Sequence, residues 1–221
     1  MSVWVSALLS VSLLYATVRL ALLYRQYQKT PHVCWALTSF VYMLSSLSWL
    51  VGQFAVSQET ALLLRQGMEW VHVTAISFSL CTLALENWYD RPGIARYPFW
   101  LNAMPLLLLL SYLMVYDTLH LKSILAGIYE GGALLIGLLI FGLFTVRNLN
   151  YLYAFAGMLM FLLSFIIFWF PGGPAVEAGW LWKIFAVAGV LSFISGYIYA
   201  QAGQIEEELS AGSEFVSSPS S

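Results

Sequence analysis

The chain has 221 residues, of which 61% are hydrophobic and only 9% are charged, and its formal net charge is -2. Ordinary soluble domains carry roughly 25% charged residues, so this composition excludes such a domain and predicts an integral membrane protein. We expect the lipid bilayer as its main partner. No nucleic-acid partner is expected, and the sequence contains no Gly-rich phosphate loop that would support nucleotide chemistry.

Seven hydrophobic segments are each long enough to cross a hydrocarbon core, which needs about 20 residues of helix. They predict an all-α, seven-helix transmembrane bundle over residues 1–200, with helices at Val3 to Tyr24, Val33 to Ala55, Met68 to Leu85, Phe99 to Tyr116, Ser123 to Val146, Leu149 to Phe170 and Trp180 to Ala200. The first segment lacks a cationic n-region and a cleavage site, so we interpret it as a retained helix.

Residues 201–221 form a polar tail that is acidic at Glu206 to Glu208 and Ser-rich at its end. We expect the last helix to continue through Ile205 and the chain to be disordered beyond it, for lack of apolar residues to bury. Gly212 to Phe215 has the character of a cloning scar.

The cationic residues predict the orientation of the bundle, because cytoplasmic connections of membrane proteins are enriched in Lys and Arg. The odd-numbered connections and the helix ends beside them hold six such residues, and the even-numbered ones hold Arg65, Lys122 and Lys183. The N-terminus is therefore expected outside and the C-terminus in the cytoplasm. This topology predicts a multi-pass membrane protein.

A few ionisable residues in the outer half of the bundle are candidate ligand-binding residues. Glu69 and His72 are three residues apart, which places both on one helical face, with Trp70 beside them. Glu130 lies about two turns into the fifth segment, next to Tyr129, and a carboxylate at that depth needs a partner within the bundle. Gly127 and Gly131 would let a neighbouring helix approach Glu130 closely.

Simpler interpretations of the same residues remain open at this point. Glu69 and His72 fit a solvated helix end, Glu130 fits a neutral packed carboxyl, and Trp70 fits an interfacial aromatic belt. A metal site is not predicted, since the segments do not bring together three ligands of a suitable type. Lys183 is too close to the start of the last segment for an opsin-like Schiff base, and no convincing set of catalytic residues is present.

One short pattern resembles a known family. Trp49, the run Phe78 to Leu85 that leads into Glu86, and the connection through Asp90 and Arg91 to Pro98 resemble the seven-helix N-terminal sensor region of many bacterial histidine kinases. The resemblance covers residues 1–200 and implies an input module. It also implies a bacterial cytoplasmic membrane. Because no dimerisation helix, PAS domain or kinase domain follows in this sequence, the resemblance implies an input module alone, which is either truncated or signals through a cytoplasmic partner.

The function we expect is therefore that of a membrane-embedded sensor or receptor. It would bind a small ligand, or respond to the state of the membrane, in its outer half and signal to the cytoplasmic side. The alternative is a small-solute or proton-coupled transporter, in which the buried carboxylate binds a cation as access alternates. An intramembrane enzyme is the third class.

Overall fold

The computed structural model describes residues 2–52, 54, 71, 73–85, 110, 119–169 and 180–216. Every regular element in these ranges is helical. The long helices are α1 (Ser2–Tyr27), α2 (Thr30–Gly52), α5 (Leu119–Arg147), α6 (Leu152–Trp169) and α7 (Leu181–Val216), and the short 3₁₀ helix η1 (Leu149–Tyr151) joins α5 to α6. The all-α class predicted from the sequence is confirmed.

Five helices are long and apolar enough to cross a membrane. Their spans are Val3–Tyr27, Thr30–Gly52, Gly127–Arg147, Leu149–Trp169 and Leu181–Gly203. A multi-pass protein in contact with lipid follows from these spans. The third predicted segment is represented by a shorter apolar helix, Val73–Leu85. The fourth, Phe99 to Tyr116, lies outside the described residues except for Leu110, so the number seven remains a prediction.

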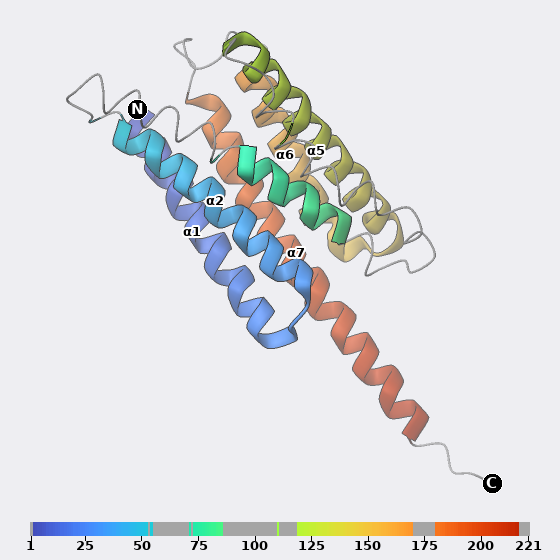
Figure 1. Cartoon of the computed structure of the whole chain (residues 1–221). Helices are drawn as coiled ribbons and strands as arrows, with labels where there is room; N and C mark the ends of the chain where they lie inside the picture. Colours follow the sequence, from blue (N-terminus) through green and yellow to red (C-terminus); the bar gives the residue numbers. More distant parts are fainter. Residues whose placement is uncertain are drawn as a thin grey trace.

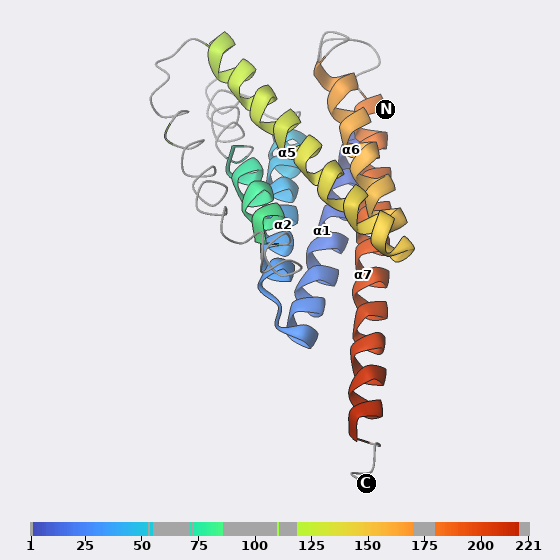
Figure 2. The same ribbon diagram turned by 90° about the vertical axis from the view of Figure 1, so that its right-hand side faces the viewer.

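The helices run back and forth between two ends of the bundle (Figures 1 and 2). The connection between α1 and α2 and the connection between α5 and α6 lie toward one end, while the N-terminus and the start of α7 lie at the other. Helix α1 packs against α2, and α7 packs against both α6 and α1. Helix α7 therefore passes along the whole bundle.

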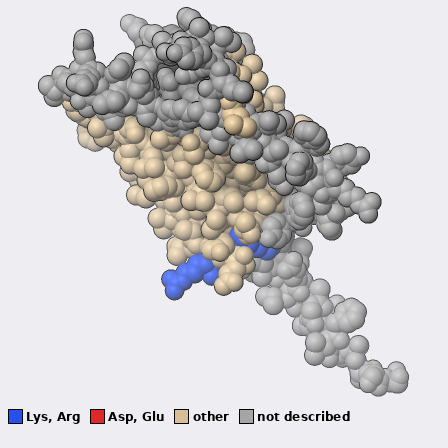
Figure 3. All heavy atoms as spheres, viewed as in Figure 1, with Lys and Arg blue, Asp and Glu red and all other residues tan. Residues whose placement is uncertain are grey.

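Lys and Arg side chains gather at the end where the α1–α2 connection lies (Figure 3). Arg25 is in the last turn of α1, and Arg147 is in the last turn of α5. Arg25 and Arg147 thus lie toward the same end of the bundle, whereas Lys183, in the first turn of α7, lies toward the other. Which side of the membrane this end faces is not decided by the structure, and the orientation remains a prediction.

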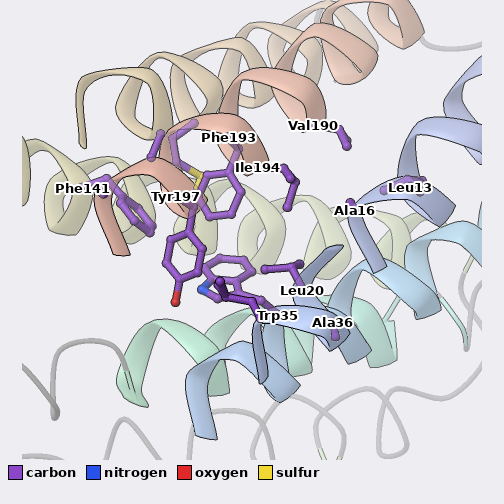
Figure 4. Packing of buried hydrophobic residues seen from close by; sticks show 14 of the residues in the cluster. Leu13, Ala16, Leu20, Trp35, Ala36, Phe141, Val190, Phe193, Ile194 and Tyr197 are labelled. Atoms are coloured by element: carbon purple, nitrogen blue, oxygen red, sulfur yellow. The ribbon is translucent and has the colours of Figure 1, made fainter. Parts of the chain in front are cut away.

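The core is centred on aromatic side chains from α2, α5 and α7 (Figure 4). The ring of Phe193 is stacked on that of Tyr197, with centroids 5.7 Å apart, and lies 4.8 Å from Trp35 and 5.1 Å from Phe141. Phe141 and Tyr197 are fully buried. Aromatic pairs at these separations add to the free energy gained from burying their surface, so this cluster fixes α7 against its neighbours.

Glycines allow α6 and α7 to approach each other at backbone distance. A Cβ atom added to Gly157 of α6 would lie 2.5 Å from the backbone nitrogen of Phe193, and one added to Gly196 of α7 would meet the backbone of Ala154. Small residues at such positions are typical of tightly associated membrane helices. The two helices therefore form a closely packed pair.

Helix α7 is longer than the sequence predicts. It continues to Val216, about three turns beyond Ile205, at which we expected the helix to end. In Figures 1 and 2 this last part of α7 projects past the end of the bundle. The backbone of residues 201–216 is thus helical, although the sequence predicted disorder after Ile205.

Candidate functional site

Glu130 lies on α5 and is half-buried against α6. Its Oε2 accepts a hydrogen bond from the indole Nε1 of Trp169 at 3.5 Å. A Cβ atom added to Gly127 would lie 3.2 Å from the ring of Trp169, and one added to Gly131 would lie 3.0 Å from the ring of Phe165. The close approach of a neighbouring helix that these glycines predicted is present, and the group it presents to the carboxylate is an indole.

The other predicted site residues are only partly placed. Tyr129 is half-buried and packs against a small apolar cluster that includes Val73 and Ala133. Glu69, Trp70 and His72 lie outside the described residues. Their convergence with Glu130 therefore remains a prediction.

A second polar centre, which the sequence did not lead us to expect, surrounds Lys183 in the first turn of α7. The side chain of Lys183 is only 3% exposed, and its Nζ donates a hydrogen bond of 2.6 Å to the Oγ of Ser6 on α1. Nζ also lies 4.6 Å from the ring centroid of Trp49 on α2 and 5.4 Å from that of Trp182. Both contacts are within cation–π range.

Two further serines extend this centre between α1 and α2. The hydroxyls of Ser10 and Ser46 are 2.8 Å apart, and Ser10 donates to the backbone carbonyl of Ser6 at 3.0 Å. Ser6 and Ser10 are buried, whereas Ser46 is half-buried. We call the set Ser6, Ser10, Ser46, Trp49, Trp182 and Lys183 the Lys183 centre.

The Lys183 centre holds a cation without an acidic partner among the described residues. Transferring an ammonium group from water to a protein interior costs roughly several kcal/mol. An opposite charge or several hydrogen bonds can compensate for this cost. Here one hydroxyl and two aromatic faces surround Nζ. An ionisable group placed this way in a membrane span is a functional-site candidate by default.

A line of aromatic rings connects the Lys183 centre with Glu130. Trp169, which donates to Glu130, is 5.5 Å from the ring of Phe168, and Phe168 is 5.2 Å from the ring of Trp182, both with edge-to-face geometry. Trp182 then lies over the ammonium group of Lys183. The acidic and basic residues therefore belong to one continuous assembly of side chains on α5, α6 and α7.

A third polar cluster lies toward the opposite end of the bundle. His32 is 1% exposed, and neither of its ring nitrogens has a hydrogen-bond partner. Gln201 of α7 lies close to this imidazole but does not form a well-aligned hydrogen bond with it. The Nε2 of Gln201 donates to the hydroxyl of Tyr151 at 3.2 Å. Polar groups on α2 and α7 thus face each other near the connections that carry the basic residues.

The described residues contain no group of three His, Cys, Asp or Glu side chains that could hold a metal ion. Cys34 and Cys81 are both free thiols. The contacts around Glu130 and Lys183 support hydrogen bonding and charge recognition by hydroxyls, indoles, the Glu130 carboxylate and the buried Lys183 ammonium group.

Comparisons of the chain with protein-family models, with curated proteins and with solved structures gave no match. Functional inference therefore depends on the residues themselves.

Proposed function

We propose that this protein is a membrane-embedded sensor or receptor. It binds a small ligand, or responds to the state of the bilayer, at the end of the bundle that holds Lys183 and Glu130, and it transmits a shift of α7 to a cytoplasmic signalling protein. One observation carries the proposal: α7 is a single helix from Leu181 to Val216 that begins at the Lys183 centre and projects past the other end.

The packing of α7 supports this mechanism. The backbone contacts at Gly157 and Gly196 hold α6 and α7 together, and the aromatic cluster around Phe193 holds α7 in the core. A displacement at the Lys183 centre would therefore move α6 and α7 together instead of bending one helix. Helix shifts of about 1–2 Å are sufficient to change contacts at signalling interfaces.

The direction of signalling in this proposal comes from the predicted topology, and the signalling role comes from the expected resemblance to histidine-kinase sensor regions. With seven spans and the N-terminus outside, the Lys183 centre faces the outer side and the projecting part of α7 enters the cytoplasm. A reporter that is active only in the cytoplasm should be active when fused after Gln204 and silent when inserted at Gly173. The reverse pattern would place the Lys183 centre on the cytoplasmic side and contradict the proposed direction of signalling.

A distance measurement tests the coupling along α7. Arg25 at the end of α1 and Ala202 on α7 are both exposed, so each can carry a spin label in a variant without the two native cysteines. In lipid nanodiscs, we expect Lys183→Met to shift the distance distribution between these labels by about 1–2 Å. Ser12→Ala, which alters a buried hydroxyl bonded only within α1, is the control and should leave it unchanged. Identical distributions in all three proteins would contradict the proposal.

The transporter alternative is favoured by one observation, namely that Glu130 and Lys183 are both ionisable groups within or beside membrane spans. Such residues often mark substrate or proton pathways. Proton flux into proteoliposomes, measured with a pH-sensitive dye, distinguishes the two classes for the proton-coupled case. A flux that requires the protein and is lost in Glu130→Gln would favour transport over sensing.

A further inference from the structure

We propose that the Lys183 centre binds the oxyanionic headgroup, a carboxylate or a phosphate, of an amphiphile in the surrounding bilayer. This inference names the ligand class of the sensor proposed above and rests on that proposal for its signalling consequence. The binding step itself follows from the chemistry of the centre.

The Lys183 centre has more hydrogen-bond donors than acceptors. The ammonium group of Lys183 has three N–H donors, and its one hydrogen bond in the described part goes to Ser6. The indole Nε1 of Trp182, whose ring lies over the same ammonium group, is buried and has no hydrogen-bond partner. A group that offers several acceptors and a negative charge would satisfy both donors at once, and oxyanions do this best.

The charge of the centre favours the same class of ligand. No carboxylate among the described residues pairs with Lys183, and Glu130 is separated from it by the rings of Trp169, Phe168 and Trp182. A cationic ligand would meet an uncompensated ammonium group at this position. A neutral apolar ligand would give the N–H donors of Lys183 and Trp182 no acceptor, and each buried donor without an acceptor costs about 1–3 kcal/mol.

The position of the centre favours an amphiphile over a water-soluble ion. Ser6 lies one turn inside the start of the span of α1, Lys183 lies in the first turn of α7, and Trp49 lies in the last turn of α2. This is the level at which headgroups meet acyl chains. Two apolar side chains next to the centre are exposed: Val3, three residues before Ser6 on the same face of α1, and Ile184, which follows Lys183 on α7. They provide a surface for an alkyl chain while its headgroup reaches the ammonium group.

Two half-buried indoles control access to Nζ. Trp49 and Trp182 cover the ammonium group with their faces, and neither is fully buried. A headgroup would replace one or both aromatic faces as the partner of Nζ, and a cation–π contact is weaker than a desolvated charge-assisted hydrogen bond. Because Trp182 belongs to α7, this exchange would act directly on the helix proposed to transmit the signal.

The test measures equilibrium binding to the full-length protein in maltoside micelles, without any signalling assay. The probe is radiolabelled dodecanoate, and the competitors are dodecyl phosphate, sodium acetate and dodecyltrimethylammonium. We expect saturable binding of dodecanoate that is displaced by dodecyl phosphate and not by the cationic amphiphile. Displacement by acetate at the same concentrations would overturn the amphiphile part of the proposal, and displacement by dodecyltrimethylammonium would overturn the charge recognition.

Matched variants locate the site. Lys183→Met should raise the Kd for dodecanoate by about tenfold or more, equivalent to about 1.4 kcal/mol. Lys29→Met removes one lysine charge at the opposite end of the bundle and should leave the Kd unchanged. Lys183→Arg keeps the charge and serves as the second variant if the methionine variant does not fold; it should retain binding. Equal affinity in wild type and Lys183→Met would overturn the site.

The two proposals fail in different ways. If dodecanoate binding depends on Lys183 but α7 is not displaced, the oxyanion site is supported and the sensor function is contradicted. If Lys183→Met displaces α7 but the wild-type protein binds neither dodecanoate nor dodecyl phosphate, the coupling along α7 is supported and the oxyanion site is contradicted.

Discussion

The Nζ of Lys183 and the Oγ of Ser6 are 2.6 Å apart, although 177 positions separate the two residues in the chain. This hydrogen bond joins the first turn of α7 to the first turns of α1, and both side chains are buried. It is therefore the polar contact through which a change at the Lys183 centre acts on both helices.

Removing the hydroxyl of Ser6 should destabilise the protein. Ser6→Ala leaves the buried ammonium group without its hydrogen-bond acceptor, and we expect the free energy of unfolding to fall by about 1–3 kcal/mol. The measurement is reversible unfolding in mixed micelles titrated with dodecyl sulfate. Ser12→Ala is the matched control, because Ser12 is equally buried but bonds only to the carbonyl of Leu9 in its own helix. A loss no larger than that of Ser12→Ala would mean that the hydroxyl of Ser6 does not stabilise the cation.

Glu130 and Trp169 should be energetically coupled. In a double-mutant cycle of Glu130→Gln and Trp169→Phe, we expect an interaction energy of about 0.5 kcal/mol or more, since contacting residues are generally non-additive. The unfolding assay in mixed micelles provides all four values. Additivity within about 0.3 kcal/mol would show that the 3.5 Å contact has no energetic weight.

The glycines of the α6–α7 contact should not tolerate a methyl group. Gly157→Ala would place Cβ 2.5 Å from the backbone of Phe193, so the helices must separate, at a cost of about 1–3 kcal/mol or more. Gly132→Ala on α5 is the control, because nothing lies within 4 Å of its added Cβ. It should be neutral or stabilising by up to about 1 kcal/mol, given the higher helix propensity of Ala. Equal effects of the two substitutions would contradict the close packing of α6 and α7.

His32 should be replaceable by an apolar residue without loss of stability. Both imidazole nitrogens are buried and lack partners, so His32→Leu removes unpaired polar groups and should be neutral or stabilising by about 1 kcal/mol. Gln201→Leu, by contrast, removes the hydrogen bond to Tyr151 and should destabilise by about 1 kcal/mol. Thermal unfolding in detergent compares the two. A large loss of stability in His32→Leu would indicate that the imidazole is paired in solution.

Hydropathy and helix-packing rules predicted much of the fold. Long apolar runs determine membrane helices strongly, because backbone groups in lipid must be bonded within the helix, and the five described spans follow the predicted segments closely. The glycines of the fifth segment predicted the close approach of another helix at Glu130. The length of α7 was not predicted, since polar residues after Gln201 carry no apolar pattern that marks a helix.

The Lys183 centre was not predicted from the sequence. Its residues come from three helices, and only tertiary packing brings Ser6, Ser46 and Lys183 together. One local signal existed: Ser6 and Ser10 are four residues apart and therefore share a face of α1. For His32 and Gln201 the only signal was that the predicted topology puts them on the same side of the membrane, since His32 directly precedes the second segment and Gln201 directly follows the seventh.

The most direct test of the sensor account is the distance between labels at Arg25 and Ala202 in nanodiscs, measured with and without saturating dodecanoate. The account predicts that dodecanoate changes the mean distance by about 1–2 Å in the wild-type background and not in Lys183→Met, while dodecyltrimethylammonium has no effect in either. An unchanged distance distribution in a wild-type protein to which dodecanoate is demonstrably bound would contradict it.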